Sequence, residues 1–104
     1  MSSIQLQDRE NISQKVLDEI KEIGFRHGIL RIVLFGSRAR GDFHKRSDID
    51  LAVFSGPDPI LEARIKSDMD NLPTLLKVDV VFMKPSMDDM LQKNVEREGV
   101  VLYE

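Results

Sequence analysis

Three acidic residues in two apolar stretches are the side chains of this sequence best placed to do chemistry. Asp48 and Asp50 stand two positions apart in the alternating stretch 47–54, so both carboxylates leave one face of a strand about 6 to 7 Å apart. At that distance they repel by about 3 kcal/mol at an effective dielectric constant near 20. Asp79 interrupts a second apolar stretch, 77–83. If the two strands are neighbours, the three carboxylates form an oxygen site suited to Mg²⁺ or Mn²⁺.

A glycine-serine pair at the end of an earlier apolar stretch suggests a second function, phosphate binding. Gly36 lets the backbone approach a phosphate closely, and the Ser37 hydroxyl and the N–H groups that follow can donate to it. Arg38 and Arg40 follow at once, so we expect them to bind a nucleotide or to brace the fold. The sequence contains neither a P-loop motif nor the dinucleotide fingerprint.

Each feature also has an ordinary structural explanation. An acid pair on a half-exposed strand is most often a solvated face, and a lone acid such as Asp79 also suits an edge strand. Gly36 alone would be a turn residue and Ser37 a helix cap. The conjunction of a Gly-Ser turn, a basic loop, paired acids and a third acid favours a phosphate-and-metal site.

The charge distribution supports one compact anionic ligand. Residues 36–47 contain four basic side chains and one acidic side chain, a local charge of +3, whereas the whole chain carries −3, which leaves −6 elsewhere. A nucleic-acid-binding domain would spread positive charge over a whole face. The positive loop instead suits an anion such as a triphosphate.

The residues around these motifs predict four helices and at least three strands. Helices are expected near residues 8–27 (capped by Asp8 or Asn11, ended by Gly24 or Gly28), at 37–41, from a cap at Asp58 to Pro73, and from Pro85-Ser86 to Gly99. Strands are expected at 30–35, 47–54 and 77–83, with a short edge strand at 100–102. This order predicts an α+β fold, a single two-layer domain over residues 1–104. Periodicity does not give the relative direction of the first two strands.

Composition excludes several classes of protein. With no cysteine there are no disulfides, thiolate metal sites or cysteine nucleophiles, in keeping with a reducing compartment. No apolar run approaches the ~20 residues of a membrane helix, and residues 1–5 do not resemble a secretion signal. We therefore expect a cytoplasmic protein without a membrane partner.

Three motifs together resemble those of the minimal nucleotidyltransferases of the polymerase β superfamily: GSRARG at 36–41, SDIDLAV at 47–53 and VDVV at 78–81. The resemblance implies a polymerase β-like core, a small mixed sheet of three to four strands with helices packed on it. It also implies metal-dependent transfer of a nucleoside monophosphate, AMP from ATP, to a hydroxyl acceptor with release of pyrophosphate.

The resemblance assigns roles by position. Gly36 and Ser37, with Arg38 and Arg40, would hold the triphosphate, and Asp48 and Asp50 the Mg²⁺ or Mn²⁺ ions. Asp79 would be the third catalytic carboxylate, either accepting the proton of the attacking hydroxyl or completing the shell of the second ion.

The resemblance also suggests a partner. Small members of the family are often encoded with a helical HEPN-type toxin, which they neutralise as antitoxins by adding AMP. The alternative is an antitoxin that silences its partner by contact and keeps a vestigial nucleotide site. A second copy of the chain as an oligomeric partner, and RNA as the acceptor, stay open at this point.

Overall fold

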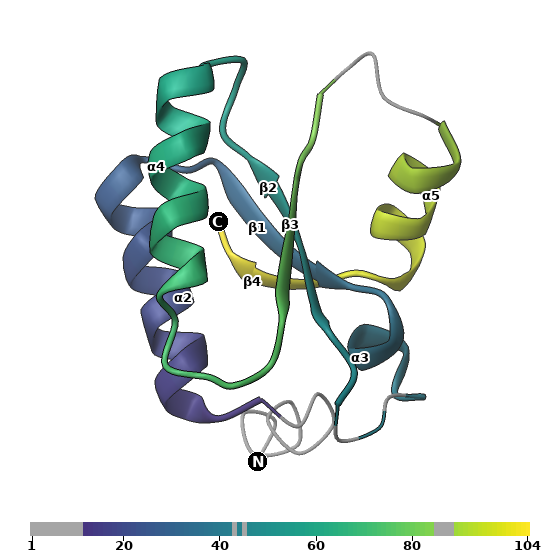
Figure 1. Ribbon diagram of the computed structural model, residues 1–104. Helices are drawn as coiled ribbons and strands as arrows, with labels where there is room; N and C mark the ends of the chain where they lie inside the picture. Colours follow the sequence, from purple (N-terminus) through teal and green to yellow (C-terminus); the bar gives the residue numbers. More distant parts are fainter. Residues whose placement is uncertain (1–11, 43, 45, 85–88) are drawn as a thin grey trace.

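The fold was analysed in a computed structural model that describes residues 12–42, 44, 46–84 and 89–104 (Figure 1). The chain alternates helices and strands. The helices are α2 (Gln14–His27), α3 (Ser37–Arg40), α4 (Pro59–Asp70) and α5 (Asp89–Glu98). The strands are β1 (Arg31–Phe35), β2 (Ile49–Phe54), β3 (Val78–Phe82) and β4 (Val100–Tyr103). The expected α+β fold is confirmed.

The four strands form one mixed sheet in the order β3-β2-β1-β4. Strand β1 is antiparallel to both β2 and β4, whereas β2 and β3 are parallel. The sequence pattern did not give the relative direction of the first two strands, and the structure shows that they are antiparallel. The expected edge strand is present as β4.

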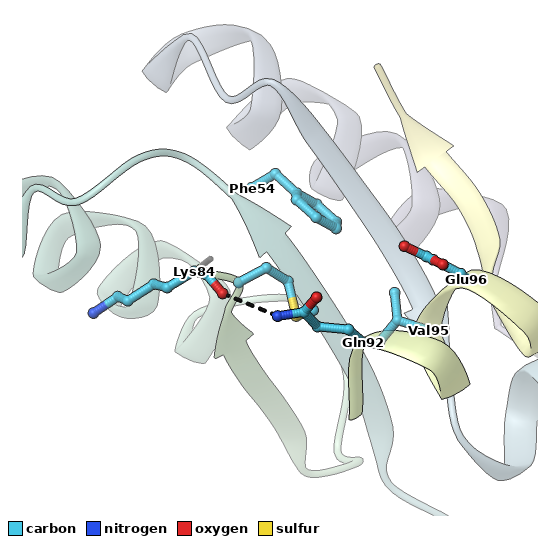
Figure 2. A pocket seen from close by; sticks show the side chains of 6 residues that line it. Phe54, Lys84, Gln92, Val95 and Glu96 are labelled. Atoms are coloured by element: carbon cyan, nitrogen blue, oxygen red, sulfur yellow. Dashed lines mark hydrogen bonds between the residues drawn. The ribbon is translucent and has the colours of Figure 1, made fainter. Parts of the chain in front are cut away.

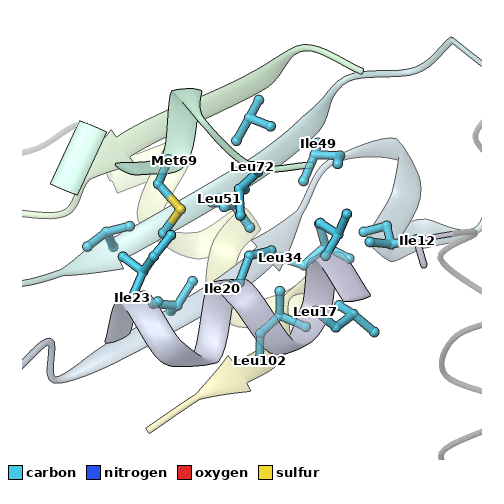
Figure 3. Close-up of a cluster of buried hydrophobic side chains, with 14 of the residues drawn as sticks. Ile12, Leu17, Ile20, Ile23, Leu34, Ile49, Leu51, Met69, Leu72 and Leu102 are labelled. Carbon is cyan, nitrogen blue, oxygen red and sulfur yellow. The ribbon is translucent and has the colours of Figure 1, made fainter. Parts of the chain in front are cut away.

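The sheet carries α2 and α4 on one face and α5 on the other (Figure 1). The alternation in β2 sends Ile49, Leu51 and Val53 into the large core under α2 and α4, and Ala52 into a smaller cluster with Val95 of α5. Figure 3 shows the large core, in which Ile20 of α2 and Met69 of α4 approach the sheet residues Leu34 and Leu51. These layers hold both faces of β2 in place.

The first helix begins later than the sequence suggested. Ser13 is its N-cap and accepts a hydrogen bond from the Val16 N–H, so α2 begins at Gln14 instead of near residue 8. The caps proposed at Asp8 and Asn11 lie outside the described residues. Of the two proposed ends, Gly28 is correct, because it adopts the left-handed conformation that closes a helix. Gly24 lies inside the helix, where a Cβ would be only 2.7 Å from the Tyr103 ring.

The ends of the two later helices agree only in part with expectation. Asp58 caps α4 with Pro59 at the first helical position, as predicted, but the helix ends at Asp70, before Pro73. The start proposed at Pro85-Ser86 lies outside the described residues, and α5 is described from Asp89 and is followed by Gly99. Within the described parts of the chain, no helix has the length and apolar character needed to cross a membrane.

A polar contact joins α2 to α4, and we expect it to stabilise the fold. The Asp68 carboxylate bonds the His27 ring at 2.6 Å and the Arg26 guanidinium at 3.2 Å, and these contacts lower the pKa of Asp68. We expect Asp68→Ala to lower the free energy of unfolding by about 1 kcal/mol at pH 7, since Asp68 is about one-third exposed. Urea titration at pH 7 and pH 3 tests this.

The pH dependence has a defined sign. Because the pKa of Asp68 is lower in the folded than in the unfolded chain, the stabilisation is full above about pH 4 and is lost as the pH falls through the lowered pKa. The stability difference between parent and variant should therefore be smaller at pH 3 than at pH 7. Asp70→Ala on the same helix removes only an exposed pair with Lys66 and should cost less than about 0.5 kcal/mol. Equal losses in the two variants would contradict the prediction.

Candidate active site

The sheet topology brings the predicted site residues to one end of the sheet. Because β1 and β2 are antiparallel, the end of β1 lies beside the start of β2, and Phe35 is paired with Asp50. Because β3 is parallel to β2, Asp79 is the register partner of Asp50 on the other side. Neighbouring strands are about 4.8 Å apart. Gly36, which follows β1, Asp50 of β2 and Asp79 of β3 therefore lie at the same end of three adjacent strands.

Gly36 lies directly against the Asp50 side chain. It has φ +78° and ψ −157°, a conformation that only glycine adopts without strain. A Cβ on Gly36 would collide with Oδ2 of Asp50. The missing side chain thus makes room for the carboxylate.

Asp50 is in an unfavourable electrostatic environment. Its pKa is raised, first by burial and then by the negative charges of Asp79 and Asp48. Arg40 and Lys77 oppose the shift without cancelling it. A negative charge held among other negative charges is typical of a site that binds a cation or a catalytic group.

The sequence interpretation missed a role for Lys77. Its Nζ lies 3.5 Å from Oδ1 of Asp79, and both side chains are substantially exposed. The signal was available, because Lys77 stands two positions before Asp79 on an extended segment and so shares its side. Lys77 is the positive group next to the third carboxylate.

The two arginines of α3, Arg38 and Arg40, have different surroundings. Arg38 is fully buried, and its Nε donates to the Ser47 carbonyl at 3.0 Å. Arg40 is exposed and forms ion pairs with Asp42, at 3.3 Å, and with Glu98 of α5, at 3.7 Å. Only Arg40 presents its charge to solvent.

Two hydrogen bonds join His44 and Ser47 in the loop that follows α3. Ser47 N–H donates to the His44 carbonyl, and the Ser47 hydroxyl accepts from the His44 N–H, both at 3.0 Å. Ser37 begins α3 and is half-buried, and its carbonyl accepts from Gly41. Asp48 is half-buried just ahead of β2, which begins at Ile49 and not at Ser47 as expected.

The carboxylates suit a divalent ion by their chemistry. Within the described residues, no group of three acidic, histidine or cysteine side chains is arranged so that it could hold a metal ion. However, Asp50 and Asp79 are adjacent in register, and the Asp50 pKa is raised, first by burial and then by the negative charges of Asp79 and Asp48. Oxygen ligands are those that Mg²⁺ and Mn²⁺ prefer. The residues present therefore fit such an ion.

Two cavities lie near the sheet. One, of about 370 Å³, borders Asp79 and Lys77, with Met69 and Leu76 in its wall. The other, of about 250 Å³, lies between α5 and the far ends of β2 and β3, with Phe54, Gln92 and Val95 around it (Figure 2). Phe54 is four residues from Asp50 on β2, about 13 Å along the strand. Only the first cavity touches a predicted site residue.

Comparison with known proteins gives a family match over most of the chain. The family model described as polymerase beta, nucleotidyltransferase, matches residues 18–104. The comparison with curated proteins gave no match.

Several solved structures have the same fold. A chain assigned as a minimal nucleotidyltransferase has a TM-score of 0.64 and 31% identity, over 81% of this chain and 86% of that one. A chain from a toxin-antitoxin structure with AMP-PNP has a TM-score of 0.60 and 29% identity, over 83% of this chain and 71% of that one. A chain from the complex of tri-AMPylated Shewanella oneidensis HEPN toxin with MNT antitoxin has a TM-score of 0.56 and 25% identity, over 88% of this chain and 71% of that one.

Proposed function

This chain belongs to the polymerase beta nucleotidyltransferase family, and from that premise we propose that it transfers AMP from ATP to a hydroxyl group on a HEPN-type partner protein. The observation that carries the proposal is the pairing of Asp50 with Asp79 in register beside the side-chain-free Gly36. Support for the nucleotide and the partner comes from similar structures, which include a toxin-antitoxin pair with AMP-PNP and an AMPylated HEPN toxin with its antitoxin.

In the proposed reaction, the acceptor hydroxyl oxygen forms a bond to the α-phosphorus of ATP. The bond from that phosphorus to the bridging oxygen breaks, and pyrophosphate leaves with the electron pair. Asp79, partly exposed beside the cavity of about 370 Å³, would accept the hydroxyl proton. Gly36 and the Ser37 hydroxyl would hold the triphosphate, with Arg40 as the exposed positive charge nearby.

Asp48 and Asp50 would hold the Mg²⁺ or Mn²⁺ ions, which when bound neutralise the charge that develops on the phosphate oxygens. The raised pKa of Asp50 agrees with this role, since a positive charge there would relieve the repulsion from Asp79 and Asp48. Asp79 could instead complete the shell of a second ion.

The test is transfer of label from α-³²P-ATP to the product of the neighbouring gene, with Mg²⁺ present. We expect the partner to become labelled with release of pyrophosphate, and labelling to stop with EDTA or with Asp48→Asn. If neither the protein nor added RNA is labelled in any condition, the proposal is refuted. If Asp48→Asn still silences the partner, neutralisation by contact is the better explanation.

A further inference from the structure

Arg38, on α3 directly after the Gly-Ser turn, is a buried charged side chain close to the proposed site. Its side chain is entirely buried, which is rare for arginine unless its charge and its donors are matched. The role of such a buried side chain is indicated by the groups that it contacts inside the protein.

The Arg38 side chain connects two segments that are nine positions apart in sequence. Arg38 lies on α3 directly after Ser37, and its Nε donates to the carbonyl of Ser47, directly before Asp48. The negative charge of Asp48 also acts favourably on the guanidinium. One side chain thus links the segment proposed to hold phosphate to the segment proposed to hold the metal.

The sheet already brings the two segments close, because β1 ends directly before Gly36 and its last residue, Phe35, is paired with Asp50 of β2. Asp48 lies just ahead of β2, outside that pairing. The bond from Arg38 to the Ser47 carbonyl therefore ties α3 to the residue before Asp48 at a point that the strand pairing does not include.

We propose that Arg38 is a positioning residue, which sets the place of Asp48 relative to the Gly36–Ser37 turn from inside the protein and does not bind the nucleotide itself. This rests on the proposed function, since it assigns Asp48 to the metal and the turn to phosphate. Groups hydrogen-bonded to a metal ligand typically change metal affinity 10- to 100-fold when they are altered. Because Arg38 is bonded to the residue directly before Asp48, we expect an effect at the lower end of that range.

The test compares Arg38→Lys with a control of similar stability. Lysine keeps the charge but lacks the planar Nε donor that reaches the Ser47 carbonyl. We expect Mn²⁺ binding in the presence of AMP-PNP, followed by the EPR signal of free Mn²⁺, to weaken about 10-fold. Ile20→Val in the core under α2 should lower the urea midpoint of unfolding with Mn²⁺ affinity unchanged.

The outcomes separate the two proposals. If the parent protein binds no Mn²⁺ with AMP-PNP, the proposed function fails, and this inference with it. If the parent binds and Arg38→Lys binds equally well, or if Ile20→Val weakens binding as much, only the positioning role is refuted.

A measurement on the parent covers the case in which Arg38→Lys does not fold. In ¹⁵N NMR the Arg38 Nε–H should stay protected from solvent exchange both without and with Mg²⁺ and AMP-PNP, because its bond to the Ser47 carbonyl persists. Transfer of that bond to a phosphate, seen as coupling to ³¹P, would show direct nucleotide binding and overturn the positioning role.

Discussion

Asp50→Asn is expected to reduce AMP transfer by about 100-fold or more while making the protein more stable. The activity falls because the variant lacks a carboxylate that would hold the metal ion. The stability rises because Asp50 and Asp79 are paired directly across parallel strands, and like charges in that position are destabilising. We expect a gain of about 1 kcal/mol in urea at pH 7.

The sign of the pH dependence follows from the raised pKa of Asp50. An acid whose pKa is higher in the folded chain holds its proton longer there, so the parent loses stability as the pH rises from about 4 through the raised pKa. The variant lacks this loss. The stability difference between them should therefore be small at low pH and grow toward neutral pH.

Asp79→Asn provides the matched comparison. It should also lose transfer activity, but Asp79 is more exposed and already paired with Lys77, so its removal should change stability by less than about 0.5 kcal/mol. An Asp50→Asn protein that is both as active and no more stable than the parent would contradict the electrostatic description of the site.

The spacing of Asp48 and Asp50 predicts that the two acids lie close together, and the negative charge of Asp48 does contribute, after burial and Asp79, to the raised pKa of Asp50. A shared strand face stays a prediction, because Asp48 lies just ahead of β2. The pairing of Asp50 with Asp79 was not predictable from spacing, since it depends on β2 and β3 being neighbours and parallel. Periodicity reports which side of a strand is buried, but strand order and direction come from how whole elements pack. The resemblance to a known family implied that Asp79 completes the site with Asp48 and Asp50, but the order and direction of β2 and β3 come from the structure.

The burial of Arg38 lay beyond sequence reasoning for a related reason. In a polar loop with four basic residues, arginine is expected to be solvated. Its burial depends on a carbonyl nine residues later, at Ser47, which no local pattern indicates. The start of α2 is a similar case: the predicted caps were Asp8 and Asn11, whereas the structure has Ser13 as the cap, and the exact first residue of a helix is rarely fixed by local pattern.

Gly36→Ala is expected to cause the second large effect, a loss of both stability and activity. Alanine at φ +78° and ψ −157° costs about 1 to 3 kcal/mol in backbone strain. Its Cβ would also collide with Oδ2 of Asp50, so the carboxylate must move from where the metal would lie. We expect the free energy of unfolding to fall by about 3 kcal/mol and transfer to fall at least about 100-fold.

Gly56→Ala separates strain from collision. Gly56 also has positive φ, at +87°, but a Cβ there meets no atom within 4 Å, and the residue lies in the connection between β2 and α4. It should lose about 1 kcal/mol from strain with transfer unchanged. Equal losses in both variants would mean that contact with Asp50 adds nothing.

A double-mutant cycle then isolates the contact itself. Asp50→Ala removes the oxygen that a Cβ at position 36 would meet, although the Asp50 Cβ remains at 3.4 Å. Gly36→Ala should therefore cost less stability in the Asp50→Ala background than in the parent, with a coupling of about 1 to 2 kcal/mol, as for residues in direct contact. Additive losses of stability would show that Gly36 is needed for its backbone conformation alone. A coupling energy of the expected size would show that glycine is needed there to make room for the Asp50 carboxylate.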